Sequence, residues 1–292
     1  MVLISDTKPR IGFIGQGYIG KNYADDFERR GYDIVRYALE DPYRANKEKI
    51  ASCDIVFIAV PTPTTPEDFD DSIVRGALEL VGEGKIAVIK STLKPGTTMS
   101  LQKEFLSRIV LHSPEFLSRA TAAYDASHPS QNIIGIPIDD LRYRASAESV
   151  SHVLPSAPAL VVSSNTSEFF KYVHNTSLFV KSVFMNLLYD TAQTLGVKWE
   201  DITDAIQKDP MLAVRHPDVS HWHITPLHVG GRGIGGPCHI KDFETFARLY
   251  HDQVGDVKGE KIIDALKHKN IALLKESGKD LDLLRGVYGD SI

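Results

Sequence analysis

Cysteine is scarce in this chain of 292 residues, which contains only Cys53 and Cys238. Two cysteines far apart in the sequence do not form a disulfide framework, so we expect a reducing compartment. Long basic runs are also lacking, and the formal net charge of -5 gives no reason to expect nucleic acid or an anionic membrane as a partner. The first residues lack a basic region followed by a long apolar run, and no later apolar stretch approaches membrane-spanning length. We therefore expect a cytoplasmic protein.

The composition is that of a globular protein, with 42% hydrophobic and 24% charged residues, and the length suits two domains. In the first half, short apolar runs rich in β-branched residues alternate with helical patterns, which is typical of βαβ units and a parallel sheet. Such runs suit strands that are covered on both faces. The predicted strands are Ile11–Ile14, Ile34–Tyr37, Ile55–Val60, Ile86–Ile89, Ile109–Leu111 and Ile133–Ile136.

A glycine motif, Gly15-Gln16-Gly17-Tyr18-Ile19-Gly20, lies between the first predicted strand and a predicted helix. This is the context of a dinucleotide-binding fingerprint. Gly15 allows the tight turn, Gly17 lets the backbone approach a pyrophosphate, and Gly20 allows the helix to pack closely on the strand. We predict that Gly15, Gly17, Tyr18, Ile19 and Gly20 bind a cofactor, with a purely structural turn as the alternative.

The end of the second predicted strand should carry an acid that binds the adenosine ribose, but Ala38 occupies the expected place. Glu40 is the best substitute, which favours NAD. Arg44 lies close enough in the sequence to keep NADP as an alternative.

The pattern changes after residue 162. Asn165-Thr166-Ser167-Glu168 has the form of a capping box that opens a long helix, which we predict to run to Leu195 before Gly196. Its apolar residues, among them Phe169, Val173, Phe179 and Leu187, cover more than a narrow stripe and predict burial on several sides. We expect an α/β fold with an N-terminal Rossmann-like doubly wound parallel sheet in residues 1–164. A mainly α-helical domain with this long central helix follows in residues 165–292.

The second cysteine lies in the segment Gly235-Gly236-Pro237-Cys238-His239-Ile240-Lys241-Asp242. Proline suits the first turn of a helix, so Cys238 would lie where unpaired N–H groups and the helix dipole favour a thiolate. In a helix, Asp242 would lie one turn further along the same face. A buried, inert cysteine is the alternative, and Cys53 is predicted to be of that kind.

Two further groups have the chemistry of a reacting site. Lys171 and Asn175 lie four residues apart on the long helix, so an ammonium and an amide from one face could share a developing alkoxide. A solvated helix face is the alternative. Glu115 follows a predicted strand, where ligand-facing residues collect in open α/β sheets, although a helix cap would also explain a carboxylate there.

Six segments occur in an order that closely resembles the UDP-glucose/GDP-mannose dehydrogenase family. They are the glycine motif, Val60-Pro61-Thr62-Pro63-Thr64, residues 90–98 (Lys-Ser-Thr-Leu-Lys-Pro-Gly-Thr-Thr), Ser113-Pro114-Glu115-Phe116-Leu117, Lys171-Tyr172-Val173-His174-Asn175 and the Cys238 segment. The resemblance implies a four-electron oxidation of a sugar primary alcohol to a carboxylate, with two NAD molecules and no metal. Members of the family capture the aldehyde on the cysteine, oxidise the thiohemiacetal to a thioester, and hydrolyse it.

The resemblance also implies roles for individual residues. Cys238 would be the nucleophile, Lys171 and Asn175 would hold the oxyanion, and Asp242 and Glu115 would act on the water that hydrolyses the thioester. The implied cofactor contacts beyond the glycine motif are Pro61, Thr62, Ser91 and Thr92, with Thr92 also near the catalytic water. The implied substrate contacts are Glu115, Phe116, Leu117, Lys171, Asn175, Arg232 and Gly235. The substrate would be a nucleotide sugar, UDP-glucose or a close relative.

Two features depart from the family. Full-length members carry a third, C-terminal domain that binds much of the nucleotide, whereas fifty residues follow Asp242 here and that domain is expected to be absent. We expect a homodimer that pairs through the long helix, as in the family. The segment before Cys238 is long and contains Arg215, a possible phosphate contact like Arg232, and four histidines. The histidines, at positions 216, 221, 223 and 228, are expected to contact substrate or solvent rather than a metal, because no ligand spacing is complete.

Two other functions remain open. A two-electron dehydrogenase of the β-hydroxyacid or 6-phosphogluconate type also joins a Rossmann domain to a long helix and uses a lysine and an asparagine, but that chemistry needs no thiol. A catalytically silent NAD-binding scaffold is the second alternative.

Overall fold

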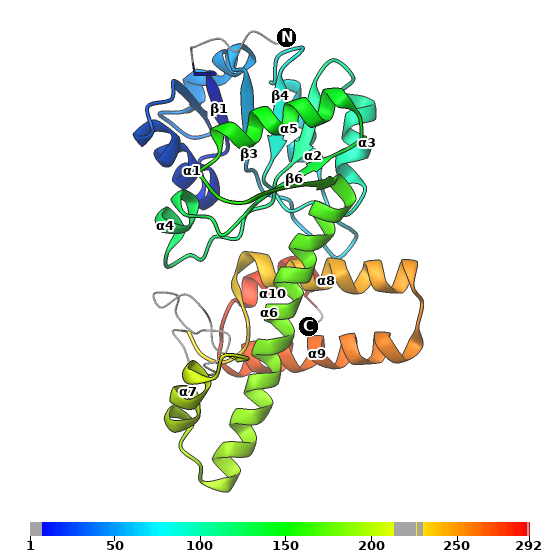
Figure 1. Ribbon diagram of the computed structural model, residues 1–292. Coiled ribbons are helices and arrows are strands. Elements are labelled where there is room, and N and C mark those ends of the chain that lie inside the picture. The colour runs from blue at the N-terminus through cyan, green and yellow to red at the C-terminus, as the bar shows by residue number, and fades with distance from the viewer. Residues whose placement is uncertain (1–7, 213–225, 227–229, 291) are drawn as a thin grey trace. The chain divides into compact units, whose positions relative to one another are not determined.

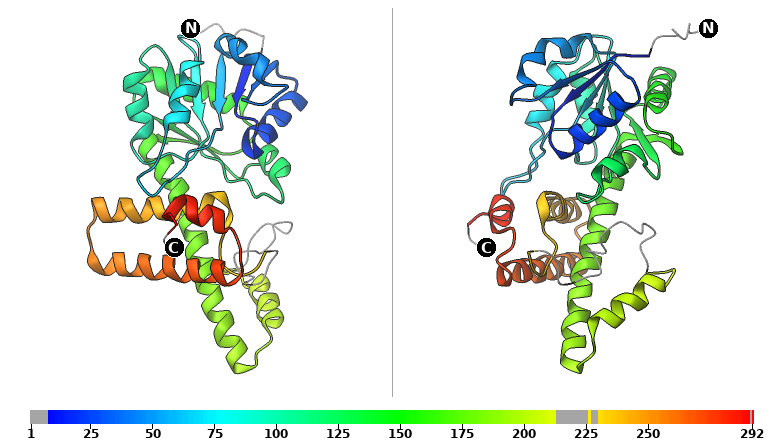
Figure 2. Two further views of the ribbon diagram at one scale, coloured as in Figure 1. Left: turned by 180° about the vertical axis from the view of Figure 1, so that it is seen from behind. Right: turned by 90° about the vertical axis from the view of Figure 1, so that its left-hand side faces the viewer.

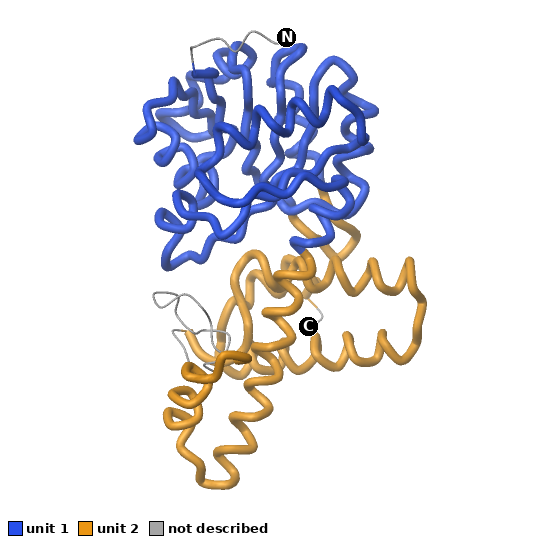
Figure 3. The backbone as a smooth tube through the Cα atoms, viewed as in Figure 1, with its two compact units in different colours: residues 1–62, 71–171 blue, residues 63–70, 172–292 orange. Residues whose placement is uncertain are grey.

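The computed structural model describes residues 8–212, 226, 230–290 and 292. The chain divides into two compact units, coloured separately in Figure 3. The first unit comprises Met1–Thr62 and Asp71–Lys171, and the second comprises Pro63–Asp70 and Tyr172–Ile292. Each unit is described by itself below.

The first unit is built on a seven-stranded sheet with the strand order β2-β1-β3-β4-β5-β6-β7. The strands are β1 (Ile11–Ile14), β2 (Ile34–Tyr37), β3 (Ile55–Ile58), β4 (Ile86–Ile89), β5 (Ile109–His112), β6 (Asn132–Ile136) and β7 (Ala159–Ser163). The first five pair in parallel, which confirms the Rossmann-like sheet expected from the apolar runs. Most of their side chains are buried, as is typical of strands covered on both faces, and the partly buried ones lie mainly in the edge strand β2.

The far edge of the sheet differs from the expectation of a wholly parallel sheet. β6 runs antiparallel to β5, and β7 pairs in parallel with β6. β7 was not among the predicted strands. It is an edge strand whose side chains are mostly exposed, with Leu160 at 49%, so the burial that marks the other strands is missing.

Six helical segments belong to the first unit ahead of the long helix. They are α1 (Tyr18–Arg29), the 3₁₀ helix η1 (Arg44–Ser52), α2 (Ser72–Glu79), α3 (Thr97–Glu104), α4 (Ala122–Ser127) and α5 (Leu141–Val153). One core cluster joins α1, α4 and α5 to the strands, and Figure 1 shows α1 and α5 on the same side of the sheet. At its centre, Phe13 stacks on Phe57 and meets Phe27 edge-on, each pair of rings 5.3 Å apart. This packing fixes α1, and with it the glycine turn, against β1.

The long helix α6 spans Ser164–Leu195 and ends at Gly196, which has a φ of 70°, as predicted. The predicted capping box is wrong. The helix begins at Ser164, and the Ser163 hydroxyl accepts a hydrogen bond from the Thr166 amide at 3.2 Å. Glu168 instead turns to another helix, as described below. Its side chain satisfies donors that are distant in sequence, which no local pattern encodes.

The second unit is helical. It contains most of α6, followed by α7 (Trp199–Lys208), α8 (Gly236–Gln253), α9 (Val257–Glu276) and α10 (Leu281–Tyr288). α8 and α9 form an antiparallel hairpin, seen in Figure 1 and from two further sides in Figure 2. Phe179 of α6 stacks on Phe243 of α8 with ring centroids 3.8 Å apart, within a cluster that includes Val183 and Ile263.

Burial of α6 is one-sided, in contrast to the expectation that it is buried on several sides. Tyr172, Phe179 and Val183 are buried, whereas Val173, Val180, Phe184, Leu187 and Leu188 are 38–53% exposed. A helix with an apolar exposed stripe offers surface for association. None of the described helices is long and apolar enough to cross a membrane.

Candidate functional site

β1 leads directly into the glycine turn at the start of α1. Gly15 has a φ of 90°, and a Cβ there would lie 2.2 Å from the Ala59 carbonyl oxygen. A Cβ on Gly20 would lie 1.9 Å from the Gly15 carbonyl oxygen, so α1 packs directly on the turn. Apart from Gly17 itself and its neighbours in the chain, no atom of the described residues lies within 4 Å of a Cβ built on Gly17. The three glycines therefore have the geometry predicted for them, with open space at Gly17.

The N-terminus of α1 suits an anion. Gly17 provides no side-chain cap, and the first turn of α1 contains no acidic residue, so neither competes with an anion for the first amide groups and the positive end of the helix dipole. Tyr18 donates a hydrogen bond to the Leu117 carbonyl at 2.6 Å, and Ile19 packs against the core of the first unit. The residues present fit the pyrophosphate of a dinucleotide.

The end of β2 turns into η1 through Glu40. This residue is exposed, and its carbonyl accepts hydrogen bonds from the Tyr43 and Arg44 amides, each at 3.1 Å. The Arg44 guanidinium folds back onto the Leu39 carbonyl at 2.5 Å. A carboxylate is therefore present at the solvent-exposed end of β2, while Arg44 also has a backbone partner.

The segments that follow β3 and β4 are tied together. The Ser91 hydroxyl accepts from the Val60 amide at 3.0 Å and donates to the Val60 carbonyl at 2.7 Å. The Thr62 hydroxyl donates to the Thr92 carbonyl at 2.9 Å. Pro61 between them is exposed. The predicted cofactor residues 61, 62, 91 and 92 thus meet at the carboxyl edge of the parallel strands, where open α/β sheets bind ligands.

Glu115 and Lys171 form a buried ion pair in the first unit. The ammonium lies 3.1 Å from Glu115 Oε1 and 2.5 Å from the Glu115 carbonyl oxygen, and both side chains are 5% exposed. The other carboxylate oxygen accepts from the Leu117 amide at 2.9 Å. Phe116 places its ring centroid 5.1 Å from the ammonium. The sequence did not indicate that these two predicted residues bind one another.

Two buried titratable residues nearby were missed in the sequence. Burial lowers the pKa of Lys90 to about 8, although Glu115 acts in the opposite direction. Its ammonium lies 3.3 Å from the Ser113 carbonyl oxygen. Burial also lowers the pKa of His112 to about 3, so that the ring is neutral and bridges the Ser167 hydroxyl and the Ser91 carbonyl. Lys90 begins the family segment 90–98, and His112 directly precedes the family segment 113–117. Their positions beside these segments could have indicated a place near the site.

Glu168, which the sequence predicted to cap its own helix, is also buried and instead caps α3. Its Oε2 accepts from the Gly96 amide at 2.7 Å, and its Oε1 accepts from the Thr98 amide and hydroxyl at 2.7 and 2.6 Å. The side chain is fully buried, and burial raises its pKa against the effect of these hydrogen bonds. Glu168 therefore fixes the start of α3, which follows Ser91 and Thr92 in the sequence.

In the second unit, Asn175 and Lys241 hold the Asp242 carboxylate. The Asn175 amide donates to Oδ2 at 2.6 Å and the Lys241 ammonium lies 2.6 Å from Oδ1. His174 lies 3.0 Å from the Asn175 amide oxygen. Asp242 is 1% exposed. A buried carboxylate with a partner on each oxygen has a fixed orientation.

Cys238 lies in the first turn of α8. It follows Gly236 and Pro237, which start the helix, and Asp242 lies on the next turn of the same helix, as predicted. Cys238 is half-buried, whereas Cys53 is fully buried. Burial raises the pKa of Cys53 to about 11, which favours the inert thiol. The two cysteines therefore have different environments.

Arg232 and Gly235 precede Cys238. The Arg232 guanidinium binds α6, where Nε donates to the Asn186 side-chain oxygen at 3.0 Å and Nη2 lies 2.7 Å from Asp190 Oδ1. A Cβ on Gly235 would lie 1.8 Å from an Asp280 carboxylate oxygen. Arg215 and the histidines at 216, 221, 223 and 228 lie outside the described residues. Among residues 8–212 and 230–290, no group of three His, Cys, Asp or Glu could hold a metal ion.

The structure thus groups the predicted residues into pairs. Lys171 and Asn175 occupy successive turns of α6, and each binds a carboxylate, Glu115 in the first unit and Asp242 in the second. This arrangement excludes the solvated helix face, because Lys171 and Asn175 are each only 4% exposed as whole residues.

Comparison with known proteins gives a consistent result. Residues 40–151 match the UDP-glucose/GDP-mannose dehydrogenase family NAD binding domain, and residues 165–271 match the central domain of the same family. The UDP-glucose 6-dehydrogenase of Streptococcus pneumoniae is 27% identical over 83% of this chain and 69% of its own length. That of Rhizobium meliloti is 29% identical over 70% of this chain and 48% of its own.

Solved structures share the fold. A UDP-glucose dehydrogenase from Pyrobaculum islandicum superposes with a TM-score of 0.75 at 25% identity, covering 93% of this chain and 70% of that one. Several curated relatives are about twice as long as the part that this chain matches. The cofactor of the first unit is NAD. With its NAD-binding and central domains both matched, the chain belongs to the UDP-glucose/GDP-mannose dehydrogenase family.

Proposed function

We propose that this chain is an NAD-dependent nucleotide-sugar 6-dehydrogenase that oxidises a C6 alcohol to a carboxylate through a covalent intermediate on Cys238. The observation that carries the proposal is a half-buried thiol in the first turn of α8, with the fixed carboxylate of Asp242 one turn further on. The relatives named UDP-glucose 6-dehydrogenase support UDP-glucose or a close relative as substrate.

The cofactor would bind at the glycine turn. The α1 amides at Gly17 and Tyr18 would hold the pyrophosphate, Glu40 would bind the adenosine ribose, and the segments at Pro61–Thr62 and Ser91–Thr92 would line the remainder. When bound, NAD supplies the acceptor for each of the two hydrides that leave the sugar carbon.

Cys238 accounts for two oxidations at one carbon. After the first oxidation, the Cys238 thiolate adds to the C6 aldehyde and forms a thiohemiacetal. The negative charge then lies on the oxygen at C6 until the thiohemiacetal is oxidised. Loss of the second hydride leaves a thioester, and attack by water releases the carboxylate and restores the thiol. The aldehyde is retained throughout because its carbon is bound to sulfur.

The buried polar pairs would serve the charged stages. The ammonium of Lys171 and the amide of Asn175, on successive turns of α6, would stabilise the oxyanion that forms at the sugar carbon. Glu115 and Asp242 would orient or deprotonate the hydrolytic water, with Thr92 near that water. Since each carboxylate is already fixed by its partner, little reorganisation is required.

The test is the stoichiometry of NADH. Purified protein is supplied with NAD and a panel of UDP- and GDP-sugars, and Cys238→Ala is compared with Cys53→Ala, which removes the other thiol. We expect two NADH per sugar for the wild type and Cys53→Ala, and loss of turnover for Cys238→Ala, with circular dichroism confirming that both variants fold.

The same assay tests the other functions. One NADH per molecule from a β-hydroxyacid, unchanged by Cys238→Ala, would instead support the two-electron dehydrogenase. NAD binding with no turnover of any sugar or hydroxyacid would support the scaffold. Either result contradicts the proposal.

We also propose a homodimer formed through α6. The apolar exposed stripe of α6 (Val173, Val180, Phe184, Leu187 and Leu188) is matched by no described covering segment, and a second copy of the helix supplies complementary apolar surface. Phe184→Glu should convert a dimer to a monomer in light scattering after gel filtration. Gln193→Glu, an exposed position on the opposite side of the helix, should not.

A further inference from the structure

In the loop before Cys238, several backbone groups form their hydrogen bonds with side chains from elsewhere in the second unit. In residues 231–236, Gly231, Gly233 and Gly236 have φ values of 101°, 82° and 80°. Residues 231–235 belong to no named helix or strand, and Gly236 begins α8, where the first amides have no partner within the helix, so these backbone groups need other partners. The end of α9 and the turn into α10 supply them.

Four side chains from the α9–α10 segment contact this loop. Ser277 accepts from the Arg232 amide at 2.8 Å, and Lys279 donates to the Gly233 carbonyl at 2.9 Å. Asn270, 2% exposed, accepts from the Ile234 amide at 2.8 Å and donates to the Ile234 carbonyl at 3.0 Å. Asp280 accepts from the Gly236 amide at 2.8 Å.

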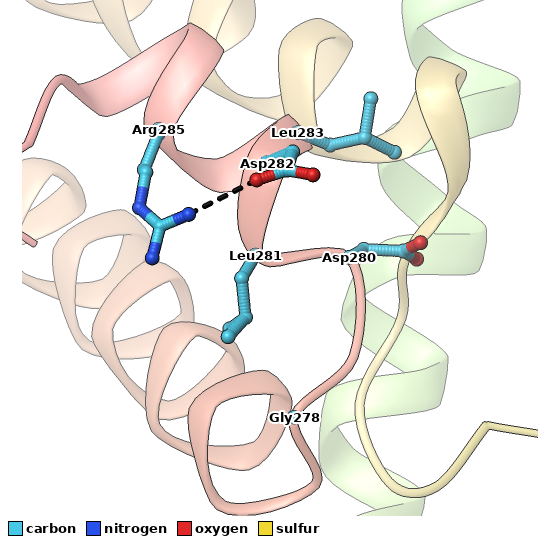
Figure 4. Close-up of a pocket in the computed structure, with 6 residues that line it drawn as sticks. All are labelled: Gly278, Asp280, Leu281, Asp282, Leu283 and Arg285. Atoms are coloured by element: carbon cyan, nitrogen blue, oxygen red, sulfur yellow. Dashed lines mark hydrogen bonds and ion pairs between the residues drawn. The ribbon is translucent and has the colours of Figure 1, made fainter.

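The contact of Asp280 is with Gly236, which lies two residues before Cys238 in the sequence. Asp280 is one of the six residues that line a surface pocket, and its carboxylate points toward the loop (Figure 4). Asp280 precedes α10, yet its side chain caps no amide of that helix and instead caps the first residue of α8. The backbone of Asp280 has a φ of 53°, the only positive φ of a non-glycine residue in the described part of the chain. Aspartate tolerates this conformation better than most residues do.

The glycines of the loop fit this contact surface closely. A Cβ on Gly231 would lie 2.5 Å from Ser277 Cβ, and a Cβ on Gly235 would lie 1.8 Å from an Asp280 carboxylate oxygen. A side chain at either position would therefore meet the α9–α10 segment itself, independently of any substrate.

We propose that Asp280 is a positioning residue that holds the start of α8 and thereby sets the place of Cys238, with Asn270, Ser277 and Lys279 holding the rest of the loop. This inference rests on the proposed nucleophilic role of Cys238. It gives the end of α9 and the turn into α10 a role in that reaction, which is to hold the loop that leads to Cys238. The task is distinct from catalysis, since Asp280 acts through the backbone of Gly236.

Three substitutions at one position separate the two contributions of Asp280. Asp280→Asn keeps an acceptor oxygen and tolerates the left-handed backbone, so it should match the wild type. Asp280→Gly keeps the backbone conformation but removes the acceptor, and Asp280→Ala loses both. Asp282→Asn, whose carboxylate is exposed and binds Arg285 at 3.0 Å, is the matched control.

Two readouts are needed. Hydrogen exchange, read by mass spectrometry on peptides from 230–240, should be roughly fivefold faster or more in Asp280→Gly than in the wild type. With a nucleotide sugar, kcat should fall about tenfold or more while KM for NAD stays unchanged, and Asp280→Asn should restore both values. Lys279→Met, which removes the contact to Gly233, should accelerate exchange in the same peptides.

Exchange in residues 230–240 of Asp280→Gly at the wild-type rate would overturn the proposal, as would an unchanged kcat. If Asp280→Gly does not fold, Lys279→Met decides by the same criterion. Because exchange needs no substrate, an inactive wild type would refute the proposed reaction, while the exchange rates would still report whether Asp280 holds the loop.

Discussion

Replacement of Lys90 by methionine should stabilise the protein at neutral pH and lose that advantage in alkali. Lys90 is 3% exposed, with its ammonium 4.2 Å from the centroid of the Tyr23 ring and 3.3 Å from the Ser113 carbonyl oxygen. Burial lowers its pKa from 10.5 to about 8. Between these values the unfolded chain binds one more proton than the folded chain, so stability rises with pH by about 1.4 kcal/mol per pH unit.

The magnitude follows from the width of that window. Below pH 8 both states are charged and the folded state carries the whole penalty, which amounts to about 3 kcal/mol. Above pH 10.5 both states are neutral and the penalty is gone. The free energy of unfolding of Lys90→Met minus that of the wild type should therefore fall by about 2 to 3 kcal/mol between pH 7.5 and 10.5.

Urea unfolding followed by circular dichroism at four pH values measures this difference. The control is Lys103→Met, an exposed lysine of α3, whose difference from the wild type should not change over the same range. A Lys90→Met difference constant to within about 0.5 kcal/mol would refute the reasoning, because a buried ammonium with a lowered pKa must release its proton in this window.

Three other predictions follow from the first unit and from α6. Gly17→Ala should leave the thermal midpoint within a few degrees of the wild type but weaken NAD binding about tenfold or more in calorimetry. Gly20→Ala should lower both the thermal midpoint and the affinity for NAD, because a Cβ added at position 20 meets backbone atoms whereas one added at position 17 does not. Lys171→Met should destabilise the chain by about 3 kcal/mol in urea, since it leaves the Glu115 carboxylate buried without its cation. Adding Glu115→Gln should restore part of that stability but no NADH formation. Glu168→Gln should cost about 2 kcal/mol of unfolding free energy, because an amide donor then faces the Gly96 or Thr98 donors, and an unchanged urea midpoint would contradict the capping role.

Local sequence patterns were sufficient wherever the fold depends on neighbouring residues. The first five strands follow from uninterrupted apolar runs, and the glycine turn follows from the spacing of Gly15, Gly17 and Gly20 between a strand and a helix. The end of α6 follows from Gly196. The helical placement of Cys238 and Asp242 likewise required only Pro237 and the periodicity of α8. In each case the deciding interaction spans a few residues of the chain.

Patterns failed where the partner is distant in sequence. Glu168 was interpreted as a cap of its own helix, but it binds amides 70 and 72 residues away. The reversed direction of β6 is set by pairing with β5, and β7 is an edge strand that lacks the burial of the others. The pairing of Lys171 with Glu115 joins residues 56 apart. The charge of Glu168, Lys171 and Glu115 indicates that each side chain needs a partner if it is buried, but it does not identify that partner.

The same distinction explains why the candidate site could be recognised more completely than its support. The proposed nucleophile and its helix form one short segment, so Cys238 and Asp242 are visible together in the sequence. The side chains that hold the preceding loop are contributed by α9 and the turn into α10, 36 to 46 residues away, and contact only its backbone. A backbone contact leaves no complementary side chain in the loop beyond the glycines it requires. Packing against Ser277 and Asp280 therefore accounts for the glycines at 231 and 235 without a bound substrate.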